Sequence, residues 1–258
     1  MDCHQYYEAE GLHGLYEREI IRFQLTLPHI LSDGDLLDVG CREGYWLRFL
    51  HERTRLALAG IDISTSRIQA AKQLLDSNAS FAVADARRLP LHNRSFTQVT
   101  AMETIEHIPE WKSALEELVR VSSQRVVVTV PYNERLKYAK CGGCGSRAPL
   151  YGHLHRFTED DFQFLRDKGD VTFDFFPHPF GVYHYVMRAL QVFTKPNVFK
   201  KGRQVASSPG DNSNNHLATI CPACYDSVPY TKYAERGAEL LVKLSTHKPE
   251  YLLVRVDK

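Results

Sequence analysis

Short runs of Val, Ile and Leu alternate along the chain with stretches whose apolar residues recur every three or four positions. Runs of the first kind are typical of strands buried on both faces of a parallel sheet, and the stretches between them are typical of amphipathic covering helices. The predicted strands are Leu36–Val39, Leu56–Ile61, Phe81–Val83, Phe96–Met102, Val126–Val130, Val171–Phe176 and Tyr251–Val256. The pattern therefore predicts a doubly wound α/β fold with a mostly parallel, seven-stranded sheet.

The helical stretches and the irregular stretches give the expected domain organisation. Residues 66–76 and 110–121 each carry their apolar side chains on one face, as a helix that packs on a sheet must. We expect an N-terminal helical segment over residues 1–33 and one domain over residues 34–258. Two irregular insertions interrupt that domain, at about 132–157 and 195–230, and Thr158 opens a variant capping box for the helix that follows the first.

Charge and hydropathy restrict the classes of partner. The 32 basic and 31 acidic residues leave a net charge of +1, which argues against binding to nucleic acid or to an anionic membrane surface. The first twenty residues carry charges throughout, and no run of about eighteen apolar residues occurs. We therefore expect a soluble, cytoplasmic protein.

Four of the six cysteines form two C-x-x-C pairs, Cys141 with Cys144 and Cys221 with Cys224. Without a secretory signal, such pairs indicate a metal site more than disulfides, and four thiolates suit a tetrahedral zinc ion. A redox role is the weaker alternative, because neither pair begins a helix after a strand. Four protein ligands leave no open position, so this zinc is expected to be structural and to tie the two insertions together.

A glycine-rich turn joins the first predicted strand to the helix after it, in the run D-V-G-C-R-E-G that begins at Asp38. The backbone amides of such a turn, together with the helix N-terminus, can contact a bound ligand. The next predicted strand ends at Asp62, whose carboxylate suits the two hydroxyls of a ribose. Together the two features indicate a nucleoside-containing cofactor.

The turn resembles the D-x-G-x-G-x-G turn of class I S-adenosylmethionine-dependent methyltransferases, with Asp38, Gly40 and Gly44 at matching positions. It departs from that motif at Arg42, where a glycine is usual. The resemblance extends over residues 34–134 and, more loosely, the last two strands. It implies the Rossmann-like methyltransferase fold, S-adenosylmethionine as cofactor, and a substrate cover built from the two insertions.

The resemblance also assigns cofactor contacts to individual residues. It places the methionine end of the cofactor beside the glycine-rich turn, the ribose at the end of the second strand, and the adenine amino group at V-A-D-A after the third strand. The implied contact residues are Asp38, Gly40, Gly44, Asp62, Ile63, Asp85 and Ala86.

The run M-E-T-I-E-H-I-P at the end of the fourth predicted strand brings Glu103, Glu106 and His107 onto one face if it turns helically. His107 is then the leading candidate for a general base, and a packing loop beneath the cofactor is the plainer alternative. The run also resembles that of metal-assisted methyltransferases, which implies a divalent ion at these three residues with His153 or His155 as a further ligand.

No motif in the sequence specifies the methyl acceptor. We expect O-methylation of a small-molecule or glycan-type acceptor, with aromatic side chains of the cover as stacking surfaces. One alternative is an RNA 2′-O-methyltransferase that uses the Glu and His cluster, although the balanced charge disfavours it. A cofactor-binding scaffold without catalysis is the other, and the complete set of aspartates at the cofactor positions argues against it.

Overall fold

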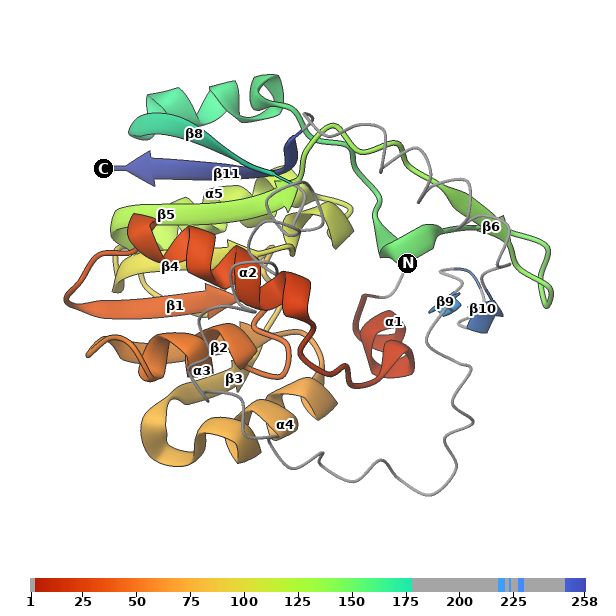
Figure 1. The fold of residues 1–258 in the computed structure, drawn as a ribbon, viewed down its shortest axis with the longest axis horizontal. Coiled ribbons are helices and arrows are strands. Elements are labelled where there is room, and N and C mark those ends of the chain that lie inside the picture. Colours follow the sequence, from red (N-terminus) through yellow and green to blue (C-terminus); the bar gives the residue numbers. More distant parts are fainter. Residues whose placement is uncertain (1–2, 178–217, 221–222, 224–226, 230–248) are drawn as a thin grey trace, which may run out of the picture.

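The computed structural model describes residues 3–177, 218–220, 223, 227–229 and 249–258. Their main feature is one seven-stranded sheet in the order β3-β2-β1-β4-β5-β11-β8 (Figure 1). Its strands are β1 (Asp35–Val39), β2 (Ala57–Asp62), β3 (Ser80–Val83), β4 (Phe96–Met102), β5 (Ser122–Pro131), β8 (Asp170–Pro177) and β11 (Pro249–Asp257). All seven predicted strands are confirmed, with ends shifted by up to four residues.

The first five strands of the sheet run parallel, and β11 is antiparallel to both of its neighbours, β5 and β8. The chain order reverses between β1 and β4, so the carboxyl ends of both strands border the place where ligands bind to open α/β sheets. Leu37 and Val39 pack into the core on one face of β1, while Leu36 packs into the core on the other. The mostly parallel, doubly wound sheet is therefore confirmed.

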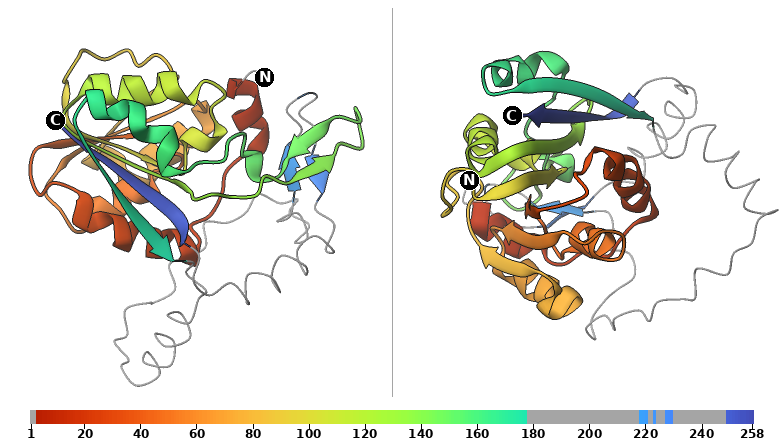
Figure 2. Two further views of the ribbon diagram at one scale, coloured as in Figure 1. Left: turned by 90° about the horizontal axis from the view of Figure 1, so that it is seen from above. Right: turned by 90° about the vertical axis from the view of Figure 1, so that its left-hand side faces the viewer.

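Helices cover both faces of the sheet (Figure 2). One face carries α2 (Glu17–Thr26), α3 (Tyr45–His51) and α4 (Thr65–Leu75), and the other carries α5 (Trp111–Val121) and the 3-10 helix η5 (Glu159–Asp167). The predicted capping box of η5 is present, with the Thr158 amide donating to the Asp161 carboxylate at 2.8 Å. Three further 3-10 turns are η1 (Leu27–His29), η2 (Asp76–Asn78) and η3 (Ile105–His107).

Smaller elements gather beside the carboxyl edge of the sheet (Figure 1). These are α1 (Cys3–Glu10), the 3-10 turn η4 (Leu150–Gly152) and two short antiparallel hairpins. One hairpin pairs β6 (Tyr138–Lys140) with β7 (Arg147–Pro149), and the other pairs β9 (Ala218–Ile220) with β10 (Ser227–Pro229). Strand β9 contacts β7, η4 and α1, so the hairpins lie side by side. Among the described residues, no helix is long and apolar enough to cross a membrane.

The difference in burial predicts that two leucine-to-alanine substitutions lower the free energy of unfolding by different amounts. Leu118 on α5 is completely buried, whereas Leu12 is 58% exposed. Leu118→Ala should lower the free energy of unfolding by about 3 kcal/mol because it leaves a cavity, and Leu12→Ala should lower it by less than about 0.5 kcal/mol. Urea denaturation of both variants measures the difference, and similar losses would contradict the packing described for α5.

Candidate active site

The glycine-rich turn closes tightly after β1. The amides of Gly40 and Cys41 both donate to the carbonyl of Ile61 on β2, at 2.7 and 3.0 Å. Gly40 has a φ of +76°, and a Cβ atom there would lie 2.3 Å from the side chain of Thr104. Only glycine fits, because the position combines left-handed backbone with a close neighbour. The turn after β1 therefore packs directly against the segment after β4.

Arg42 stands where the related turns carry glycine, and its backbone has the left-handed φ of +50° that glycine adopts more easily. Its guanidinium reaches the carboxylate of Glu19 on α2 at 3.3 Å and that of Glu43 at 3.7 Å. The side chain thus links the turn to α2, and Arg42 also lines the pocket above the turn.

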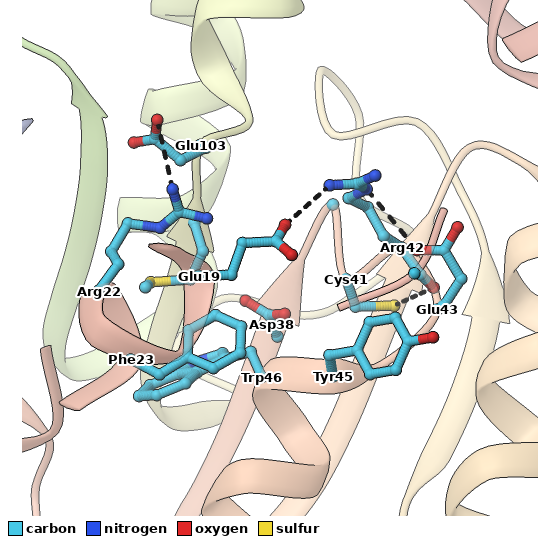
Figure 3. A pocket seen from close by; sticks show the side chains of 13 residues that line it. Glu19, Arg22, Phe23, Asp38, Cys41, Arg42, Glu43, Tyr45, Trp46 and Glu103 are labelled. Carbon is cyan, nitrogen blue, oxygen red and sulfur yellow. Dashed lines mark hydrogen bonds and ion pairs between the residues drawn. The ribbon is translucent and has the colours of Figure 1, made fainter. Parts of the chain in front are cut away.

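That pocket lies between the turn, α2 and the end of β4 (Figure 3). Its lining includes Asp38 and Gly40 from the turn, Arg22 from α2, and Glu103 after β4. Arg22 points toward Glu103, and Nη1 lies 3.6 Å from Oε2 of that carboxylate. Within the described chain, Nε of Arg22 is buried without a hydrogen-bond partner. A charged donor is therefore available at the wall of the pocket.

Asp38 is the most strongly perturbed carboxyl group of the turn. It is 2% exposed, and its Oδ1 accepts a hydrogen bond from the Thr100 hydroxyl at 2.7 Å. Burial raises the pKa of Asp38 to about 8, the Thr100 hydrogen bond opposes that shift, and the nearby Asp62 adds to it. A cationic group in the pocket would favour the ionised form of Asp38.

Asp62 and Asp85 hold positions that the sequence assigned to ribose and adenine, but neither is among the residues lining the pocket. The Asp62 carboxylate is buried and accepts hydrogen bonds from the amides of Arg42 and Ser64, both at 2.9 Å. Burial raises its pKa, although Arg67 and the two amides oppose the shift. Asp85 is engaged by the guanidinium of Arg87.

The N-terminal helix covers this part of the edge. Glu10 at the end of α1 forms an ion pair with Arg67, which lies near Asp62. Ile63 and Ala86, two more residues expected to contact the cofactor, each follow the end of a strand. Ile63 is half-buried after β2, and Ala86 packs against the core after β3. Gly44, with a φ of +82°, is the N-cap residue of α3.

The segment after β4 begins with strained backbone, since Glu103 has a φ of +50°. It then forms η3, in which Glu106 is completely buried. Neither carboxylate oxygen of Glu106 has a hydrogen-bond partner among the described residues. Burial raises the pKa of Glu106 well above its usual range, and the neighbouring Glu103 adds to the shift. A buried carboxylate without partners is costly unless a ligand or a proton compensates it.

His107 completes the predicted trio. Its Nδ1 lies 3.2 Å from the carbonyl oxygen of Gly152, and its Nε2 lies 3.8 Å from Oε1 of Glu106. Burial lowers the pKa of His107 well below its usual value, and the nearby His153 lowers it further. The imidazole is therefore neutral near pH 7.

Only one of the two candidate histidines joins this group. The His153 ring contacts the His107 ring edge-on with centroids 5.0 Å apart, and its Nδ1 lies 2.5 Å from the Glu134 carboxylate. Nε2 of His155 instead donates to the carbonyl oxygen of Ile108 at 2.9 Å, and the ring packs near Trp111. The ligand atoms of Glu106, His107 and His153 all lie within 4.8 Å of one another.

Sequence reasoning missed Arg22 and Glu134. Arg22 is an ordinary basic position within an amphipathic helix, so no local motif marks it. Glu134 had a usable signal, because it follows β5 by three residues and the carboxyl ends of parallel strands share one edge.

The cysteine pairs are described only in part. Cys141 is buried in the turn between β6 and β7, where its carbonyl accepts a hydrogen bond from the Gly145 amide at 3.0 Å. Cys144, in the same turn, is exposed. Cys221 and Cys224 lie outside the described residues, as does most of the insertion at 195–230.

The comparisons with known proteins agree with the turn and the sheet. A family model described as a methyltransferase domain matches residues 36–124. A methyltransferase from Streptomyces halstedii is 31% identical over 91 residues, which is 33% of each chain. A tocopherol O-methyltransferase from Arabidopsis thaliana is 37% identical over 93 residues, covering 34% of this chain and 27% of that protein. The matches thus span about a third of these relatives.

A solved structure extends the likeness in fold to nearly the whole chain. The S-adenosylmethionine-dependent methyltransferase from Mesorhizobium loti aligns with a TM-score of 0.55 and 15% identity, over 93% of this chain and 98% of that one. At that identity the likeness concerns the fold. Residues 36–124 therefore match a methyltransferase domain, and the chain shares its fold with this solved methyltransferase.

Proposed function

We propose that this chain transfers the methyl group of S-adenosylmethionine to a hydroxyl of a small-molecule or glycan-type acceptor. The observation that carries the proposal is the contact between the Gly40 turn and Thr104. It holds the turn expected to bind the cofactor against the segment that bears Glu103, Glu106 and His107. Cofactor and acceptor groups would then meet at one edge of the sheet.

The side chains around the pocket fit the polar ends of the cofactor. Gly40 and Cys41 of the turn line the pocket, so backbone of the turn borders the space proposed for the methionine end. Asp38 and Glu103 offer carboxylates to its ammonium group, and the buried guanidinium of Arg22 offers donors to its carboxylate. Asp62 would accept hydrogen bonds from the ribose hydroxyls once α1 moves away from this part of the sheet edge.

Glu103, Glu106 and His107 are proposed to act on the acceptor. When bound, S-adenosylmethionine supplies an electrophilic methyl carbon, and its carbon–sulfur bonding pair stays on sulfur as the methyl moves to oxygen. The acceptor hydroxyl would also lose its proton to a base. Neutral His107 can take it at Nε2 or hold an ion that polarises the hydroxyl, and its Nδ1–H remains donated to Gly152 in either case.

Relatives favour a small acceptor. By name, those most similar in sequence include a tocopherol O-methyltransferase and an ajmaline N-methyltransferase, and a tRNA carboxymethyltransferase also occurs among them. Of the aromatic residues in the insertions, Tyr151 is 47% exposed beside the site, whereas Phe157 belongs to the core. A surface for stacking against a sugar or a flat acceptor is therefore proposed at Tyr151. An RNA acceptor and a non-catalytic scaffold are not favoured.

The two cysteine pairs are proposed to hold one structural zinc ion. Cys141 and Cys144 lie in the turn of the β6–β7 hairpin, and by chain connectivity Cys221 and Cys224 fall between β9 and β10. The two hairpins lie side by side, which suits a four-thiolate site between their turns. Such a site would fix the cover against α1 and η4.

Replacing Asp62 tests the placement of the cofactor. Asp62→Asn should weaken the binding of S-adenosylhomocysteine about 10-fold or more, because a charge-assisted pair to the ribose is lost. Asp33→Asn, at the opposite end of β1, should leave affinity unchanged. Calorimetry measures both, and circular dichroism verifies folding. Unchanged affinity in Asp62→Asn would refute the placement.

The wild-type protein should transfer the labelled methyl group of S-adenosylmethionine to a small-molecule or glycan fraction.

Arg22 should discriminate between ligands with and without a carboxylate. Wild type should bind S-adenosylhomocysteine at least about 10-fold more tightly than 5′-methylthioadenosine, since the guanidinium–carboxylate pair is charge-assisted. Arg22→Met should remove most of that ratio, whereas Arg18→Met on the same helix should retain it. Competition binding gives the ratios, and an unaltered ratio in Arg22→Met would contradict this role.

Zinc content tests the cysteine proposal. Protein purified without chelators should contain about one zinc per chain bound by thiolates. Cys144→Ser should lose the metal and loosen the cover, while Cys41→Ser, in the glycine-rich turn, should keep it. Elemental analysis and limited proteolysis provide the readouts. Zinc-free wild-type protein, or full zinc content in Cys144→Ser, is the opposing result.

A further inference from the structure

Three hydrogen-bond acceptors come together from two distant parts of the chain. Glu106 and His107 belong to η3 after β4, and His153 follows η4 in the first insertion. One oxygen or nitrogen atom of each lies within 4.8 Å of the others, and Oε1 of Glu106 lies 3.8 Å from Nε2 of His107. None of the three residues lines the pocket above the glycine-rich turn. They therefore form a polar group separate from the one proposed for the methionine end of the cofactor.

Hydrogen bonds at Nδ1 determine what the two imidazoles present at Nε2. The carbonyl oxygen of Gly152 lies 3.2 Å from Nδ1 of His107, and the carboxylate of Glu134 lies 2.5 Å from Nδ1 of His153. Carbonyl and carboxylate oxygens accept hydrogen bonds, so each neutral ring carries its proton on Nδ1. Each Nε2 then presents a lone pair. With the carboxylate of Glu106, the group offers three acceptors and no donor.

Glu106 is the buried floor of this group. Its side chain is fully buried, and neither carboxylate oxygen has a hydrogen-bond partner in the part of the chain that the structure describes. The side chains of His107 and His153 are 22% and 16% exposed, so solvent reaches the group on the side of the imidazoles. Burying a carboxylate without a partner is costly, and a cation that donates hydrogen bonds to it removes that cost.

The spacing of the three acceptors suits an ammonium group better than a metal ion. Acceptors arranged around a tetrahedral ammonium at a hydrogen-bond length of about 2.9 Å lie about 4.7 Å apart. Ligands of one tetrahedral ion at about 2.1 Å lie only about 3.4 Å apart. The 3.8 Å between Glu106 and His107 exceeds that separation, and the span of 4.8 Å matches the wider arrangement. Glu103, a further ligand of the ion expected from sequence, instead pairs with Arg22.

We propose that Glu106, His107 and His153 bind the primary ammonium group of the methyl acceptor, which is a small molecule with a hydroxyl and a primary amine, such as an amino sugar. A primary ammonium carries three N–H donors around one nitrogen, which matches the three acceptors. A quaternary ammonium has no such donor, and the donors of a guanidinium lie in one plane. Glu134 positions His153 through its Nδ1–H. The inference rests on the proposed methyl transfer, because it names the acceptor of the same site.

Tyr151 offers a second contact to such an acceptor. Its side chain is 47% exposed, and its ring centroid lies 5.8 Å from that of His153. A sugar or aromatic ring stacked on Tyr151 would therefore lie beside the imidazoles that hold the ammonium. Under this assignment His107 anchors the acceptor instead of taking its hydroxyl proton.

Amines and their neutral analogues test this subsite without requiring turnover. Glucosamine with glucose forms one pair, and tyramine with 4-(2-hydroxyethyl)phenol forms the other. In at least one pair, the amine should bind to protein saturated with S-adenosylhomocysteine at least about 10-fold more tightly than its analogue, because hydrogen bonds to a buried carboxylate are charge-assisted. Glu106→Gln and His153→Ala should each remove most of that ratio. Ligand-observed NMR titration measures the affinities.

Two matched controls and one metal ion complete the binding test. Glu116→Gln on α5 and His51→Ala at the end of α3 replace exposed side chains and should keep the ratio. Every variant should retain S-adenosylhomocysteine affinity, which verifies folding, and added Mn²⁺ should leave the preference for the amine unchanged. Equal affinities within both pairs, no measurable binding of either amine, a preference that requires Mn²⁺, or a full ratio in Glu106→Gln overturns the ammonium site.

The products of methyl transfer separate failure of this inference from failure of the proposed function. Label from methyl-labelled S-adenosylmethionine should enter small molecules that a cation exchanger retains at neutral pH. Label confined to neutral or acidic products overturns the ammonium site and leaves the proposed methyl transfer standing. Absence of label from every product overturns the proposed function itself.

Discussion

The contact between Gly40 and Thr104 joins the two halves of the site. Five neighbouring parallel strands end at the same edge, so their loops must share a small space. The turn after β1 fits beside the segment after β4 only because Gly40 has no side chain, since a Cβ atom there would overlap Thr104. This packing sets the pocket against η3, and the positions of Arg22 and Glu106 relative to the turn follow from it.

Buried charge is the second feature of the edge. Asp38, Glu103 and Glu106 all lie where burial raises the pKa of a carboxyl group, and only Glu103 among them faces a guanidinium. Burying unpaired carboxyl groups costs stability, so a protein that retains several at one edge is suited to cationic ligands. A sulfonium cofactor is such a ligand.

The strands and the turn were predictable because their signals are local. A strand buried on both faces is a continuous apolar run, and D-V-G-C-R-E-G is one continuous motif. Arg22 and Glu134 were not predictable in this way, because contacts between segments distant in sequence define their roles. His153 and His155 illustrate the limit. Alternate residues of an extended segment point to opposite sides, so the spacing indicates that one joins the site, and packing decides which.

The hairpins were missed for a related reason. Each strand of β6, β7, β9 and β10 has three residues, too few for an alternating pattern to emerge. The pair Cys141 and Cys144 nevertheless marked the turn between β6 and β7, because its C-x-x-C spacing is local. Prediction of the strands from sequence thus succeeded where buried apolar residues are adjacent in the chain.

The central claim is that the cofactor methyl group lies against the segment that follows β4. Nuclear Overhauser contacts from ¹³C-methyl-labelled S-adenosylmethionine, bound to the protein, test this most directly. Contacts are expected between the methyl protons and protons of residues 103–107, including the His107 ring. Contacts confined to side chains away from that segment would contradict it.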